Sequence, residues 1–77
     1  MKKLKITERV CAISMTTELH VVAIRAEEGE VITDSRDYGV YGQEVHRFSR
    51  NNLAQLMRTG WYQRDLAKGC TITYNLI

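Results

Sequence analysis

Hydrophobic and polar residues alternate in several short segments of the chain, which is the pattern of β-strands that are buried on one face. The first such segment runs from Arg9 to Thr16. Its apolar side carries Cys11, Ile13 and Met15. Thr16 to Glu18 have the composition of a turn. Leu19 to Arg25 follow with the β-branched and apolar residues that are typical of a central strand, so the first 25 residues predict two strands joined by a turn.

The pentapeptide AEEGE at residues 26–30 gives the clearest local prediction. Glu27 and Glu28 suit the middle of a type I turn, and Gly29 can adopt the left-handed conformation that completes a three-residue hairpin loop with a bulge. Val31 to Ser35 then fit the returning strand. The glutamates favour an exposed turn over a cation site, because hard cations need oxygen ligands at tighter and more regular spacing.

A helix is predicted from Arg50 to about Thr59. Ser49 suits its N-cap, and Phe48 and Leu53 stand at the two positions of a hydrophobic staple. The apolar stripe of this helix consists of Leu53, Leu56 and Met57. Gly60 either ends the helix as a C-cap or lies inside a longer one. We favour the first alternative, followed by a turn and a shorter helix that carries Trp61, Tyr62 and Leu66 and reaches Lys68, with Gly69 as its cap.

The last eight residues, CTITYNLI, alternate strictly and predict the most regular strand of the chain. One face of this strand carries Cys70, Ile72, Tyr74 and Leu76. The resulting order, β-β-β-α-β, predicts one small α+β domain over residues 1–77, a mainly antiparallel sheet with one helix or a broken helix packed on one face. If the final strand lies at an edge of the sheet, its unpaired backbone groups allow a homodimer or a partner strand.

The composition adds limits to this picture. Seventy-seven residues make one domain, and 44% hydrophobic and 26% charged residues are the proportions of an ordinary folded protein. The basic start MKKLKITERV is not followed by an apolar run of signal-peptide length, and no later run approaches a membrane span. These features predict a cytoplasmic protein with no membrane partner.

The residues that carry chemistry do not form a recognisable motif. Cys11, Cys70, His20 and His46 include no pair at the short spacing of a zinc site, so we expect no metal and interpret the thiols as small buried hydrophobes. No spacing places a cysteine or serine beside a histidine, and no cofactor motif is present. A chain this short also builds a poor water-excluding pocket. We therefore predict a protein that is not an enzyme and has no cofactor.

A binding role is the better hypothesis. Tyrosine, tryptophan and arginine, the residue types that dominate protein-binding hot spots, are dense between residues 38 and 64. We assign Trp61 to the core. The predicted partner-binding residues are Tyr38, Tyr41, His46, Arg47, Arg50, Arg58 and Arg64. The sequence thus favours an adaptor or inhibitor that docks on a larger protein or complex, a design common among small proteins of phages and mobile elements.

Nucleic-acid binding is the alternative. Residues 1–38 hold six basic and seven acidic side chains, whereas residues 39–77 hold five basic and two acidic ones. A basic face on the helical half could contact phosphates, and the two tyrosines could stack on bases. The net charge of +2 is small for such a protein, which makes this the second hypothesis.

Overall fold

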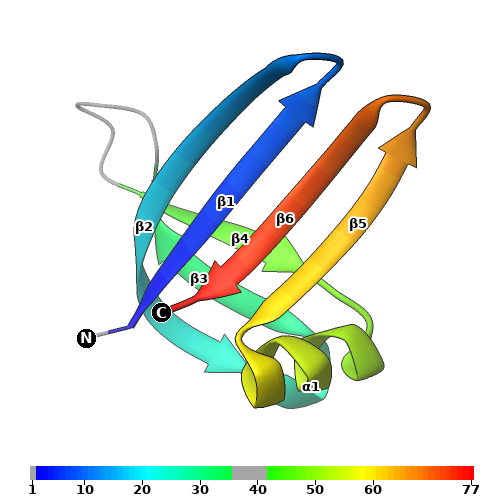
Figure 1. Cartoon of the computed structure of the whole chain (residues 1–77). Helices are drawn as coiled ribbons and strands as arrows, with labels where there is room; N and C mark the ends of the chain where they lie inside the picture. The colour runs from blue at the N-terminus through cyan, green and yellow to red at the C-terminus, as the bar shows by residue number, and fades with distance from the viewer. Residues whose placement is uncertain (1, 36–41) are drawn as a thin grey trace.

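Six antiparallel strands form one curled sheet in the order β4-β3-β2-β1-β6-β5 (Figure 1). The computed structural model describes residues 2–35 and 42–77. Its elements are β1 (Lys3–Val10), β2 (Ile13–Arg25), the short 3-10 helix η1 (Ala26–Glu28), β3 (Glu30–Asp34), β4 (Gln43–Arg47), α1 (Arg50–Thr59), β5 (Trp61–Ala67) and β6 (Cys70–Leu76). The α+β character is confirmed, but the helix is preceded by four strands and followed by two, one more on each side than the predicted order has.

The predicted strand from Arg9 to Thr16 is wrong. The chain turns at Cys11 and Ala12, between β1 and β2, and the expected turn at residues 16–18 lies inside β2. Leu4 and Ile6 explain the difference, because they are 0% and 1% exposed and anchor β1 in the core. The lysines on either side of Leu4 obscured this alternation in the sequence.

The second predicted helix is also wrong, since residues 61–67 form β5. Strand β6 supplies the pairing partner, with Tyr62 opposite Tyr74 and Arg64 opposite Ile72. The sequence left open whether the final strand lies at an edge of the sheet, and the structure places β6 between β1 and β5. Gly69 accordingly does not cap a helix; it lies in the β5–β6 turn with a φ of 80°.

The helix α1 and its caps are confirmed. The Ser49 side chain accepts a hydrogen bond from the backbone N–H of Asn52 at 3.1 Å. At the other end Gly60 has a φ of 77°, and its N–H donates to the Leu56 carbonyl at 2.7 Å. The left-handed conformation predicted for Gly29 is confirmed as well, but the loop is one residue longer than predicted, because Arg25 pairs with Glu30.

The core lies where the curled sheet and α1 enclose apolar side chains. Phe48 is its aromatic centre, with ring centroids 4.8 Å from Tyr74 and 5.9 Å from Tyr62 in edge-on geometry. The buried cluster consists of Leu4, Ile6, Leu19, Val31, Phe48, Leu53, Leu56 and Tyr74. Two side chains that we assigned to the core are outside it, since Met57 is 47% and Trp61 44% exposed.

The two cysteines are free, and the expectation that both are buried is wrong. Cys11 is exposed and Cys70 is half-buried. The two cysteines are neighbours in the fold. Cys11 directly follows Val10, which pairs with Cys70, and the Cys11 N–H donates to the Gly69 carbonyl at 2.9 Å.

Replacing Cys11 by glycine is expected to stabilise the protein by about 1 kcal/mol. Val10 pairs directly with Ile13, so Cys11 and Ala12 form a two-residue hairpin loop. Cys11 has a φ of 56° and is the one described non-glycine residue with positive φ, which fits the first central position of a type II′ turn, where glycine is preferred. Thermal unfolding checks this, with Cys11→Ala as the control for loss of the thiol. An unfolding midpoint for Cys11→Gly at or below that of Cys11→Ala contradicts the strain argument.

Candidate protein-binding surface

Two hairpins extend beyond the core as parallel arms. One is the β1–β2 hairpin and the other the β5–β6 hairpin, and both reach away from α1 (Figure 1). β1 and β6 pair along their length, so the arms form one continuous sheet. We call the face of this sheet that carries Leu4, Ile6 and Tyr74 the inner face, and the opposite face the outer face.

Apolar side chains continue along the inner face past the end of the core. Residues directly opposite each other in a ladder share a face. Val10 pairs with both Ile13 and Cys70, and the next row joins Glu8 to Met15 and Ile72. Val10 and Glu8 are an even number of positions from Leu4 and Ile6 along β1, so both rows belong to the inner face. We call Val10, Ile13, Met15, Cys70 and Ile72 the arm surface.

The arm surface is largely open to solvent. Ile13 is 71%, Met15 66% and Val10 55% exposed. Leu66, 57% exposed, lies near its end, at the bulge where the register between β5 and β6 shifts. The arm surface also contains charge, because Glu8 lies between Met15 and Ile72 in one row, and Arg64 follows Ile72 at the border. A contiguous exposed apolar area with a polar rim is typical of protein interaction sites.

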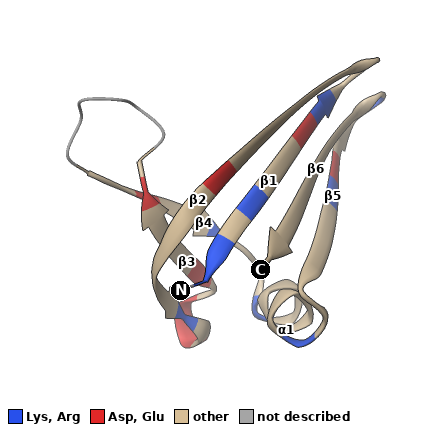
Figure 2. Cartoon of the chain, turned by 60° about the vertical axis from the view of Figure 1, so that its left-hand side comes forward, with Lys and Arg blue, Asp and Glu red and all other residues tan. Residues whose placement is uncertain are grey.

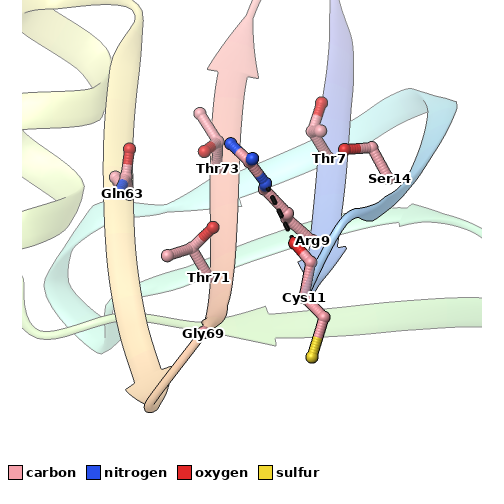
Figure 3. Close-up of a pocket in the computed structure, with 8 residues that line it drawn as sticks. All are labelled: Thr7, Arg9, Cys11, Ser14, Gln63, Gly69, Thr71 and Thr73. Carbon is pink, nitrogen blue, oxygen red and sulfur yellow. Dashed lines mark hydrogen bonds between the residues drawn. The ribbon is translucent and has the colours of Figure 1, made fainter.

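The outer face of the arms has different chemistry. A shallow open groove of about 460 Å³ is lined by hydroxyl, amide and guanidinium groups (Figure 3). Arg9 lies across it and donates its Nε–H to the Cys11 carbonyl at 3.3 Å. Thr7 and Thr16 lie 3.3 Å apart through their hydroxyl oxygens. The groove holds no buried charge and no histidine among its lining residues, so its geometry does not resemble a catalytic centre.

The predicted partner-binding residues do not form one surface. Tyr38 and Tyr41 lie outside the described residues. His46 Nε2 and the hydroxyl of the buried Thr33 are 2.9 Å apart, a contact that ties β4 to β3. The histidine thus has a structural contact within the sheet.

The predicted arginines are also spread out, and several hold the fold together. Arg64 donates to the Arg47 carbonyl at 3.1 Å and lies 5.8 Å from the Phe48 ring centroid, a cation–π contact. Arg47 lies 3.7 Å from Glu30, an ion pair between an exposed guanidinium and a carboxylate that is 14% exposed. Arg50 donates to the Glu27 carbonyl at 3.0 Å.

The other basic side chains do not complete a basic face. Arg58 is exposed in the last turn of α1, and Lys68 is exposed in the turn between β5 and β6, at the far end of that hairpin. Figure 2 shows basic and acidic positions interspersed over the described strands, whereas α1 carries only the two arginines at its ends. The nucleic-acid hypothesis therefore stays a prediction without a gathered basic surface to support it.

Sequence reasoning missed the arm surface. Its residues lie at alternate positions near the ends of β1, β2 and β6, and we interpreted them as the buried side of a strand. The sequence did contain one indication of this surface. The apolar residues on one face of the strands are more numerous than a single ten-residue helix can cover.

In residues 2–35 and 42–77 no group of three or more His, Cys, Asp and Glu side chains could hold a metal ion. The helices of this part of the chain are too short or too polar to cross a bilayer. Comparisons with protein-family models, with curated proteins and with solved structures found no match to this chain.

Proposed function

We propose that this protein is a non-enzymatic binding module that docks on a larger protein or complex through the arm surface, as an adaptor or an inhibitor. The observation that carries the proposal is the exposure of Val10, Ile13 and Met15, between 55% and 71%, on the face of the sheet that elsewhere forms the core. Burying about 100 Å² of such surface yields roughly 2.5 kcal/mol, so a partner that covers the arms gains affinity from them.

The chemistry of the arm surface favours a protein over a nucleic acid as the partner. Nucleic-acid surfaces need cations placed for phosphates and aromatic rings placed for bases. The arm surface instead consists of aliphatic side chains, a methionine and a thiol, with one acidic residue, Glu8, within it and one basic residue, Arg64, at its border. Methionine adapts its shape to a partner, which suits a docking surface.

Val10→Asp is expected to weaken partner capture about tenfold or more, because a carboxylate on the arm surface would have to be desolvated in the complex. Thr73→Asp is the matched control, since it places the same charge on the outer face of the same sheet. The measurement is capture by tagged protein from a lysate of its own source, divided into nuclease-treated and untreated halves, with quantitative mass spectrometry of the retained proteins.

Two results would contradict the proposal. Equal capture by wild type and Val10→Asp shows that the arm surface is not the docking site. Retained material that disappears with nuclease shows that nucleic acid is the partner. Circular dichroism of both variants confirms that they are folded before capture is compared.

A further inference from the structure

Strand β2 has an edge without a partner strand along its first half. β1 pairs with one side of β2 from Ile13 to His20, whereas β3 pairs with the other side only from Val21 onward. Among the described residues no strand covers this outer edge, which is a border of the sheet in Figure 1. Uncovered backbone groups of this kind accept an additional strand.

This edge also lacks the features that usually prevent strand addition. The segment ISMTTELH contains no lysine, arginine or proline, and its one acidic residue is Glu18. The two edge strands of the sheet, β4 and β5, differ from this segment. β4 is only five residues long and carries Glu44, His46 and Arg47. β5 has a bulge between Asp65 and Ala67. Short charged strands and bulges protect edges against pairing. The β2 edge is therefore the most open border of the described sheet.

The hydrogen bonds to β1 determine which backbone groups of β2 point outward. Hydrogen-bonded and non-hydrogen-bonded pairs alternate along an antiparallel ladder. Val21 donates its N–H to the Lys2 carbonyl at 3.0 Å, so every second residue from Val21 back to Ile13 directs its backbone groups to β1. The intervening residues direct their N–H and C=O groups to the open edge. They are Ser14, Thr16, Glu18 and His20.

We propose that a second copy of the chain pairs with this edge, so that two β2 strands run antiparallel about a twofold axis at Thr16. Thr16 then faces Thr16 of the second copy, and Ser14 faces Glu18 of the second copy. All outward backbone groups of these three residues are paired. An axis at Met15 would instead place Glu18 opposite Ala12, in the hairpin turn. An axis at Thr17 would place Ile13 opposite Val21, which already pairs with Thr33 of β3. The backbone thus favours the axis at Thr16, and this inference does not depend on the proposed function.

The charges agree with the same register. Arg9 pairs with Ser14 in the β1–β2 ladder, so Glu18 of one copy lies in a row with Ser14 and then Arg9 of the other, all on the outer face. Glu18 and Arg9 are two strand spacings apart, about 9.6 Å, a distance that these two long side chains can bridge over the small Ser14. Within one copy Glu18 is opposite Lys5 in the β1–β2 ladder, but it forms no ion pair with Lys5 or with another described residue. The twofold axis repeats the Glu18 to Arg9 pair, which gives the contact charge complementarity.

Apolar contacts also form in this register. Ile13, 71% exposed, faces Leu19 of the second copy on the inner face, and Met15 faces Thr17 of the second copy. Leu19 belongs to the core cluster. The dimer therefore places the exposed arm of one copy beside the core of the other.

Thr16→Pro is expected to weaken this dimer at least about a hundredfold, because proline removes a central backbone donor and places its ring in the contact. The same substitution leaves the monomer's ladder complete, since the Thr16 N–H faces outward. Thr16→Val, which keeps the N–H, is the matched control. Analytical ultracentrifugation over a range of concentrations up to millimolar measures the association of this 8.9 kDa chain.

A charge exchange tests the register independently of folding. Arg9→Glu and Glu18→Arg are each expected to weaken association about tenfold, and the double variant is expected to restore it. A wild-type protein that stays monomeric at millimolar concentration overturns the proposal, as does a dimer that Thr16→Pro leaves intact. A dimer that loses affinity with Thr16→Pro but shows no recovery in the double variant overturns the register.

Discussion

Replacing Gly29 by alanine is expected to lower the free energy of unfolding by about 3 kcal/mol or more. Gly29 has a φ of 69°, and a Cβ at this position would overlap the backbone carbonyl oxygen of Phe48. The two segments cannot simply separate, because the Phe48 N–H donates to the Gly29 carbonyl at 2.8 Å. A domain of this size has a total stability of roughly 4 to 12 kcal/mol, so the variant is expected to lose at least about a quarter of that stability.

Gly69→Ala is the control for the conformational part of this effect. Gly69 has a φ of 80°, close to that of Gly29, but no atom lies within 4 Å of its hypothetical Cβ. Its substitution is expected to cost only about 1 kcal/mol. Urea unfolding followed by circular dichroism compares the two variants. Similar midpoints for both would show that the contact between the Gly29 loop and Phe48 is not tight.

The second large effect is expected for Leu56→Ala, which should destabilise the protein by about 2 to 5 kcal/mol. Leu56 is 0% exposed and lies in the buried cluster, where its removal leaves a cavity beneath α1. The cost does not come from helix propensity, because alanine is the better helix former of the two.

Met57→Ala provides a neighbouring control on the same helix. Met57 is 47% exposed, so truncating it is expected to cost less than about 1 kcal/mol. Chemical unfolding of both variants gives the comparison. A loss for Met57→Ala equal to that of Leu56→Ala would mean that the helix packs on the sheet with a different face.

The residues that could be interpreted correctly from sequence alone are those that act locally. Ser49, Gly60 and Gly29 each fit one backbone conformation, and the structure has that conformation at all three. The strict alternation of residues 70–76 predicted β6 for the same reason, because its two faces differ in polarity at every position. Caps, tight turns and regular alternation depend on neighbours in sequence, which a single chain reveals.

The errors occur where the partner strand decides the structure. Residues 61–67 carry apolar side chains that fit either a helix or a strand, and pairing with β6 selects the strand. Likewise β1 was missed because its alternation is short and its burial depends on both β2 and β6. Strand propensity is a property of the surroundings, so sequence periodicity alone could not settle these segments.

The candidate site was harder to predict than the fold for a related reason. Aromatic and arginine content directed attention to residues 38–64, yet Arg64 and Phe48 contact each other within the fold. Val10, Ile13 and Met15 have the same polarity pattern as core residues. Whether such positions are covered depends on the extent of α1 and of the curled sheet, and that is a property of the tertiary structure.

The pairing of β1 with β6 has a consequence for the order of folding. β1 is the first strand to be synthesised and β6 the last, yet they are adjacent at the centre of the sheet, and Lys3 and Ile77 exchange backbone hydrogen bonds of 2.7 and 2.9 Å. During translation β1 can form only its hairpin with β2, and its other edge waits until β6 has left the ribosome. Contacts this distant in sequence slow folding. Closure of the sheet is therefore a late step of folding, and until then the nascent chain exposes the edge of β1 to other strands.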